Sequence, residues 1–162
     1  MNQNYIRQEV YLIMSKIDPG RVKTAKKLKI DRNFTPCPIQ DDDELYQNGI
    51  FVFNITKMYE YIESHSTDFD LIQIEVEDFP KSFSSIDESH IDSVNIAQPV
   101  ILAEISPGNY NLIDGNHRKE KARKIGISRI YAYKLNVEHH LKFMTEKESY
   151  KSYIKYWNGK LR

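Results

Sequence analysis

The order of apolar and polar residues predicts a strand, a turn, a second strand, a helix and a closing strand in the second half of the chain. Residues 99–105 (PVILAEI) are apolar and β-branched, and residues 107–109 (PGN) are typical of a hairpin turn. The returning strand is expected to end at Asp114. Residues 119–126 (KEKARKIG) favour a helix with a glycine at its C-terminal cap, and residues 129–135 (RIYAYKL) favour the closing strand.

The first half of the chain carries two apolar stripes at helical spacing and two short apolar runs. Residues 5–17 predict a helix, and residues 50–53 (IFVF) favour a short buried strand. Asn54 is typical of a helix N-cap, and the apolar stripe that follows it continues to about Ser64. Residues 71–76 (LIQIEV) alternate in polarity and predict a further strand.

Shorter helical patterns follow the strand at 71–76 and close the chain. Residues 86–95 favour a short helix capped by Ser85, and Asn136 is typical of an N-cap before a helix over 137–144. A last helix is expected over 146–157. One face of that helix carries four large apolar side chains, which are Tyr150, Tyr153, Ile154 and Trp157. We expect this face to pack against the domain; self-association into a homo-oligomer is the alternative.

Composition excludes several classes of protein. A chain of 162 residues is long enough to bury a core, and one domain is the default. The formal net charge is zero, so the total charge favours neither a nucleic-acid nor a membrane partner. The single cysteine excludes an internal disulfide framework. The polar start and the lack of a run of about 20 apolar residues complete the prediction of a cytoplasmic protein without a membrane partner.

Five residues at the junction of the second strand and the helix, Asp114-Gly115-Asn116-His117-Arg118, concentrate the candidate chemistry. We call residues 114–118 the signature turn. A helix N-terminus here would present free N–H groups and a partial positive charge, which suit a phosphate. Gly115 permits close backbone approach, Asn116 and His117 can donate hydrogen bonds, and the fork of Arg118 suits bidentate phosphate binding. The simpler alternatives are a turn glycine and a buried salt bridge at Arg118.

Asp114 has several possible roles. It can cap the helix, hold a magnesium ion, or accept a proton from an attacking hydroxyl. From Tyr110 to Lys134 there are seven basic and two acidic residues, and this local positive field would attract an anionic ligand.

The DGNHR run, followed by Lys-Ala-x-x-x-Gly and the strand at 129–135, resembles the ParB/sulfiredoxin superfamily, including its ParB-like nuclease members and the free-serine kinases. The resemblance covers residues 71–135. It implies a small α/β core in which Gly115, Asn116, His117 and Arg118 hold nucleotide phosphates. Residues 1–70 would then be an N-terminal extension with helices and one strand, and 136–162 a set of C-terminal helices, packed as one compact unit.

The chain also departs from this superfamily. Sulfiredoxins place a catalytic cysteine where this chain has Asn116, and the only cysteine, Cys37, lies far away. The chromosome-partitioning members carry a following helix-turn-helix domain, for which the 27 residues after Leu135 are too few. DGNHR is closer to the serine-kinase and nuclease versions. In the serine kinases a further acid ahead of the first helix helps catalysis, and Asp87 or Glu88 is the candidate here.

A basic run lies between residues 16 and 32 and includes Lys23, Lys26, Lys27 and Lys29. A solvated face is the simpler interpretation, and contact with a nucleic-acid backbone is the alternative. The four acids at 41–44 would be able to offset this run within the fold.

Histidines outside the signature turn are expected to be structural. His90 is expected at the surface or in a helix cap. The pair His139-His140 lacks a cysteine or carboxylate at metal-ligand spacing, so we expect an exposed helix start.

Three functions follow as hypotheses. The leading one is a nucleotide- or phosphate-binding protein, with ATP, ADP or CTP and Mg²⁺, that acts as a phosphotransferase or nucleotide hydrolase. The second is a nucleic-acid-binding protein or nuclease that uses the basic run together with the signature helix. The third is a catalytically inactive module that senses a nucleotide or binds a partner. The sequence leaves open whether the protein is an enzyme.

Overall fold

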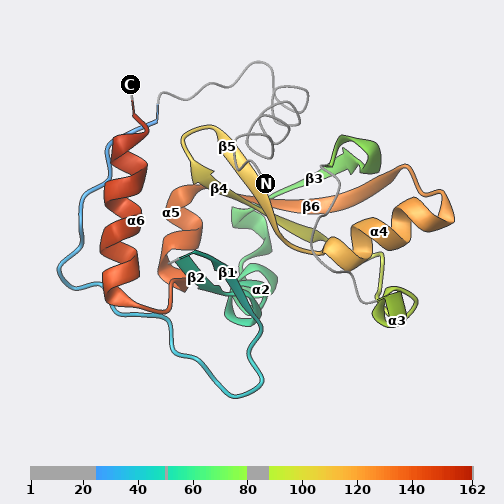
Figure 1. Ribbon diagram of the computed structural model, residues 1–162, viewed down its shortest axis with the longest axis horizontal. Helices are drawn as coiled ribbons and strands as arrows, with labels where there is room; N and C mark the ends of the chain where they lie inside the picture. Colours follow the sequence, from blue (N-terminus) through green and yellow to red (C-terminus); the bar gives the residue numbers. More distant parts are fainter. Residues whose placement is uncertain (1–24, 50, 80–87, 162) are drawn as a thin grey trace.

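The computed structural model describes residues 25–49, 51–79 and 88–161 of the chain (Figure 1). The helix predicted over 5–17, together with Lys23, Ser85 and Asp87, lies outside these residues. The described chain forms a two-stranded hairpin, a four-stranded mixed sheet and helices around them. The prediction of an α+β fold with a small mixed sheet flanked by helices is confirmed.

The larger sheet has the strand order β3-β6-β4-β5. Its strands are β3 (Asp70–Glu75), β6 (Arg129–Leu135), β4 (Val100–Ser106) and β5 (Asn109–Asp114). Strands β4 and β6 run parallel, and the two outer pairs are antiparallel. Because β4 is central and covered on both faces, it reads as one nearly continuous apolar run. The strands predicted from the apolar patterns are therefore present.

The smaller sheet is a hairpin of β1 (Leu45–Asn48) and β2 (Phe51–Asn54). The sequence predicted one strand in this region, and the structure has two. β1 gave a weak apolar signal because Leu45 and Tyr46 are followed by the polar residues Gln47 and Asn48. Helix α2 (Ile55–Ser64) begins directly after β2, and the Asn54 side chain accepts a hydrogen bond from Lys57 N at 3.0 Å, as predicted for an N-cap.

The remaining helices are short except for α4 and α6. They are α3 (Glu88–Ile91), α4 (Asn116–Ile125), α5 (Val137–His140) and α6 (Lys147–Gly159), with 3-10 turns at Ser66–Asp68, Val76–Asp78 and Leu141–Phe143. Gly126 caps α4 with a φ of 77°, as predicted. α5 is shorter than the predicted 137–144 because the chain turns extended at Met144, which bridges to Phe53.

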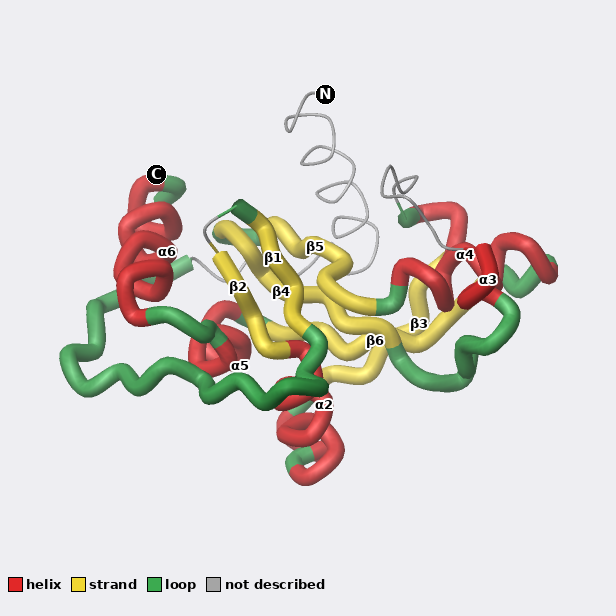
Figure 2. Tube along the Cα trace, turned by 60° about the horizontal axis from the view of Figure 1, so that its bottom comes forward, coloured by secondary structure: helices red, strands yellow, loops and turns green. Residues whose placement is uncertain are grey.

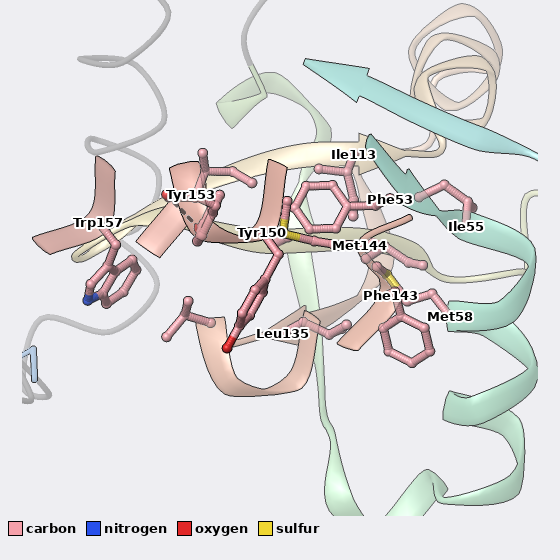
Figure 3. Packing of buried hydrophobic residues seen from close by; sticks show 14 of the residues in the cluster. Phe53, Ile55, Met58, Ile113, Leu135, Phe143, Met144, Tyr150, Tyr153 and Trp157 are labelled. Carbon is pink, nitrogen blue, oxygen red and sulfur yellow. Dashed lines mark hydrogen bonds between the residues drawn. The ribbon is translucent and has the colours of Figure 1, made fainter. Parts of the chain in front are cut away.

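Two hydrophobic clusters cover the sheet. The larger one joins β2, α2, β4, β5, α5 and α6, and Figure 3 shows Phe53, Met144 and Tyr153 packed together in it. Buried residues from 53 to 157 share this cluster, so all three predicted segments contribute to one core. The smaller cluster lies under α4, where Ala122 packs with Phe79 and with aliphatic side chains of the β3, β4 and β6 strands.

Helix α6 packs its predicted apolar face inward. Tyr153 is fully buried and Trp157 is 2% exposed, so this face belongs to the core and the prediction of a packing face is confirmed. Residues 25–34, which we call the strap, run along this helix. The Trp157 indole N–H donates to Lys26 O at 2.9 Å, and the rings of Phe34 and Tyr150 stack at 3.8 Å.

The expectation that His139-His140 begins an exposed helix is wrong for His140. This side chain is fully buried, and its Nε2 lies 2.6 Å from Glu104 O. Burial lowers the pKa of His140 to about 4, so the ring stays neutral at neutral pH. The carbonyl of β4 gives this histidine a partner that sequence spacing does not show. No helix within the described ranges is long and apolar enough to span a membrane.

Candidate functional site

The signature turn is fixed by Gly115. Strand β5 ends at Asp114, and Gly115 turns the chain into α4 with a φ of 108°, which favours glycine. A Cβ at this position would lie 2.2 Å from Val100 Cγ1 and 3.2 Å from Arg118 Nε. No side chain fits there without moving β4. The glycine therefore holds the start of α4 directly against the central strand.

The N-terminus of α4 has no side-chain cap. Gly115 occupies the N-cap position, no side-chain hydrogen bond caps the helix, and the first turn contains no acidic residue. Neither Asp114 nor Asn116 therefore acts as the predicted cap. The first N–H groups of a helix have no partner within the helix, and they carry about half a positive charge together. These are the properties that bind an anion.

Arg118 is buried beside this N-terminus. The residue is 8% exposed, and its Nη2 donates to Asp114 Oδ2 at 2.6 Å and to the Tyr59 hydroxyl at 2.8 Å. The simpler sequence interpretation, a buried salt bridge, is thus present. Arg118 Nε is also buried and has no hydrogen-bond partner among the described residues. The positive charge is held under the turn and cannot swing into solvent.

Tyr59 is a site residue that the sequence analysis missed. It lies on α2, where it was counted only as part of an apolar stripe. Its hydroxyl donates to Pro99 O at 2.8 Å while it accepts from Arg118, and the Arg118 Cζ lies 5.8 Å from its ring centroid. Burial raises the pKa of Tyr59, and the nearby charge of Asp114 raises it further. The phenol therefore remains a neutral link between α2 and the signature turn.

Glu44 is the second residue that the sequence analysis missed. Glu44 directly precedes β1, and its backbone is held at the start of α2. Glu44 N donates to Thr56 Oγ1 and Glu44 O accepts from Ile55 N, both at 2.8 Å. Although the residue is exposed overall, loss of hydration around the carboxyl group raises the pKa of Glu44. The charge of Asp114 raises the pKa further. Only the three-dimensional pairing of β1 with β2 could reveal this acid.

The structure does not describe the side chains of the two acids suggested from the sequence. Glu88 begins α3, which packs near α4, but its side chain and Asp87 are outside the described part of the chain. Their catalytic role stays a prediction. Glu44 precedes α2, the first described helix, and its carboxyl group interacts electrostatically with Asp114, Arg118 and His117. It is therefore the acid that the structure associates with the signature turn.

The positive field expected from α4 is partly neutralised. Lys119 is 1% exposed, and its Nζ lies 3.5 Å from Glu120 Oε1; burial lowers the pKa of this lysine. Lys121 donates to the carbonyl oxygens of residues 92 and 94, and Arg123 pairs with Glu120 at 2.6 Å. Ile125, at the end of α4, is 55% exposed. The basic side chains of α4 thus serve its packing as much as any ligand.

The described residues offer few ligands for Mg²⁺, so most ligands of a bound ion would have to come from a phosphate. No group of three or more His, Cys, Asp or Glu side chains in the described ranges is arranged to hold a metal ion. The donor set at the turn consists of Asp114, whose Oδ2 accepts from Arg118, and Glu44 nearby. One or two carboxylates together with substrate phosphates are a usual environment for Mg²⁺. The residues therefore fit an ion that arrives with a nucleotide.

The basic residues of the strap lie far from the signature helix. Lys26, Lys27 and Lys29 are exposed beside α6, at the opposite end of the long axis from α4 in both views (Figures 1 and 2). The structure therefore does not place these lysines beside the signature helix, and the joint use of the two stays a prediction. Of the acids at 41–44, Asp43 accepts from Asn54 Nδ2 at 2.7 Å beside α2, and Asp42 and Asp43 interact electrostatically with Lys57.

Comparison with protein-family models, with curated proteins and with solved structures finds no match for this chain. The resemblance to the ParB/sulfiredoxin superfamily therefore stays a prediction based on the DGNHR run and the elements around it.

Proposed function

We propose that the signature turn binds the phosphate groups of a nucleotide. The proposal depends above all on one observation, the uncapped N-terminus of α4 beside the buried charge of Arg118. Backbone N–H groups of the first turn, with the side chains of Asn116 and His117, would contact the phosphate oxygens. Gly115 allows the close approach. Arg118 would contribute its positive charge from beneath the turn while Asp114 and Tyr59 hold it in place.

The proposed reaction is phosphoryl transfer or nucleotide hydrolysis, as the resemblance to the free-serine kinases implies. Such reactions rest mainly on positioning and charge stabilisation. Glu44 suits the role of proton acceptor, because a raised pKa brings a carboxylate closer to the basicity that acid–base catalysis at neutral pH requires. Asp114 would hold Mg²⁺ together with the phosphates, and the ion would supply neutralisation of the phosphate charge.

The direct test is a calorimetric titration with ATP, ADP and CTP in the presence of Mg²⁺. The informative variant is Asn116→Asp, which places a negative charge in the first turn. This charge favours the helix but repels a phosphate, so affinity should fall at least tenfold in a fully folded protein. Gln73→Glu is the matched control, since it adds the same charge at an exposed position of β3, on the opposite edge of the sheet from β5.

The outcome also distinguishes an enzyme from a binding module. Binding that Asn116→Asp weakens and Gln73→Glu leaves unchanged would support the site, and release of phosphate or transfer to an added hydroxyl acceptor would support catalysis. Binding without turnover would favour the nucleotide-sensing alternative. Failure of every nucleotide to bind the folded native protein would refute the proposal.

A further inference from the structure

The strap and α6 bring together basic residues that are more than a hundred positions apart in the sequence. The Asn158 side chain accepts from Leu28 N at 2.8 Å and donates to Leu28 O at 2.9 Å, and Trp157 donates to Lys26 O. The strap is thus attached through its backbone. Its basic side chains are exposed and are not needed for this attachment.

The joined surface is strongly positive. Residues 25–34 and 146–161 contain eight basic and three acidic residues, a net charge of +5 in a chain whose formal net charge is zero. We call the eight basic residues the basic ridge; they are Lys26, Lys27, Lys29, Arg32, Lys147, Lys151, Lys155 and Lys160. Among the described residues, Lys151 is the member of the ridge with an ion pair, to Glu148 at 2.7 Å.

The lysines of α6 form a straight row beside the strap. Lys147, Lys151 and Lys155 recur every fourth residue, so they share one side of the helix at a spacing of about 6 Å. Asn158 follows Lys155 by three positions and lies on the same side, and Asn158 is the residue that holds Leu28. The row therefore borders the strap, and these three lysines form one surface with the basic residues of the strap. Lys160, five residues after Lys155, lies on another side of the helix.

The chemistry of the basic ridge favours one class of partner. The apolar face of α6 is buried in the core, as Tyr153 and Trp157 show, so the helix has no apolar face to insert into a lipid surface. Protein–protein interfaces are depleted in lysine. Lysine side chains are point charges that suit phosphates along a backbone rather than base edges. Near the row, Tyr150 and Tyr153 are buried in the core and Lys160 Nζ lies 5.3 Å from the Tyr156 ring, so α6 presents no series of exposed rings on which single-stranded bases would stack.

From these observations we propose that the basic ridge binds the phosphate backbone of a nucleic-acid duplex without sequence preference. The surface lies at the opposite end of the molecule from α4 (Figures 1 and 2), so this inference does not rest on the proposed nucleotide site.

The test uses the full chain and a fluorescein-labelled duplex of random sequence, with fluorescence anisotropy measured from 25 to 200 mM NaCl. The triple variant Lys147→Gln, Lys151→Gln and Lys155→Gln removes the row on a helix that tolerates glutamine well. The matched control, Lys57→Gln, Lys124→Gln and Lys142→Gln, removes the same charge from α2, α4 and the turn after α5. Circular dichroism confirms that both variants fold.

We expect native binding that weakens steeply with salt. In the triple variant the magnitude of the slope of log K against log salt should fall by about 2 to 3, since each lost phosphate contact removes about 0.9. Affinity at 50 mM NaCl should fall at least tenfold, whereas the control should stay within about threefold of native. No binding at 25 mM NaCl, or equal loss in the control, would overturn the proposal. Tighter binding to vesicles of 30% phosphatidylserine than to the duplex would also overturn it.

Discussion

Two junctions in this molecule connect a strand to a helix through a single residue, and they solve the same problem differently. Between β6 and α5 the connecting residue is Asn136, whose side chain accepts from His139 N at 2.9 Å, and Glu138 adds a negative charge to the first turn. Between β5 and α4 it is Gly115, which offers no cap, and no acid follows. The start of α5 therefore has a side-chain cap, whereas the start of α4 has none. We call the first the capped junction and the second the open junction.

Compared with α5, helix α4 lacks the stabilisation that a capping side chain would supply. A capping side chain is typically worth about 1 kcal/mol, and an acid in the first turn adds about 0.3–1 kcal/mol. At α4 both are missing, and Val100 blocks every side chain that might have capped from position 115. A helix start that has no side-chain cap, beside a buried arginine, therefore supports the proposal of an anionic ligand at this junction.

The largest expected loss of stability comes from adding a methyl group at Gly115, in the open junction. Gly115→Ala should lower the free energy of unfolding by about 4 kcal/mol, because the added Cβ overlaps Val100 and the φ of 108° strains any other residue. Urea unfolding measures the loss. Gly126→Ala is the control, since Gly126 has a φ of 77° with nothing within 4 Å of an added Cβ, and it should cost about 1 kcal/mol. Equal costs for the two variants would show that the Val100 contact is unimportant.

Breaking the ion pair under the open junction should come next. Arg118→Met leaves Asp114 with a side chain only 14% exposed and without its partner, which should cost about 3 kcal/mol. Arg123→Met breaks the pair with Glu120 on the same helix, but the Arg123 side chain is 36% exposed, and the cost should stay below about 1 kcal/mol. Thermal unfolding of both variants separates a buried structural charge from a surface pair. A negligible cost at Arg118 would contradict the burial argument.

Near the capped junction, the buried His140 at the end of α5 should make the free energy of unfolding decrease in acid. The folded pKa is about 4 and the ordinary value is 6.5, so the unfolded chain binds the proton first. Stability should therefore be complete above pH 6.5 and fall by about 2 kcal/mol as the pH decreases to 4.5. Urea unfolding across this range measures the loss. His140→Gln should flatten the profile, and His139→Gln should change it less, because His139 is only half-buried.

The open junction was predictable from the sequence, and its surroundings were not. A glycine between a β-strand pattern and a helix pattern, followed by Asn-His-Arg, is a local signal, and the strand, the glycine and the helix all lie where the pattern predicts. Glu44 and Tyr59 join this turn from segments 55 to 70 positions earlier in the chain. Their participation depends on how β1, β2 and α2 pack on the sheet, and no local pattern records that packing.

Two features of the fold that the sequence did not show have the same origin. His140 was expected to begin an exposed helix because the histidine pair lacks a cysteine or carboxylate at metal-ligand spacing, yet the Glu104 carbonyl gives it a partner inside the core. The basic run was expected to act together with the signature helix, whereas Trp157 and Asn158 attach the strap to α6. In both cases a long-range hydrogen bond to a backbone group decided the outcome, and backbone groups carry no sequence signal.

The smallest effect tests the comparison most directly, because it asks what an asparagine does at each junction. Asn136→Ala removes a capping hydrogen bond and should cost about 1 kcal/mol. Asn116→Ala, at the first position of α4, removes no cap and should change the free energy of unfolding by less than about 0.5 kcal/mol. Chemical unfolding of the two variants under identical conditions measures the difference. If Asn116→Ala proved as costly as Asn136→Ala, the start of α4 would be satisfied by its own side chain, and the case for an external anion at this junction would fail.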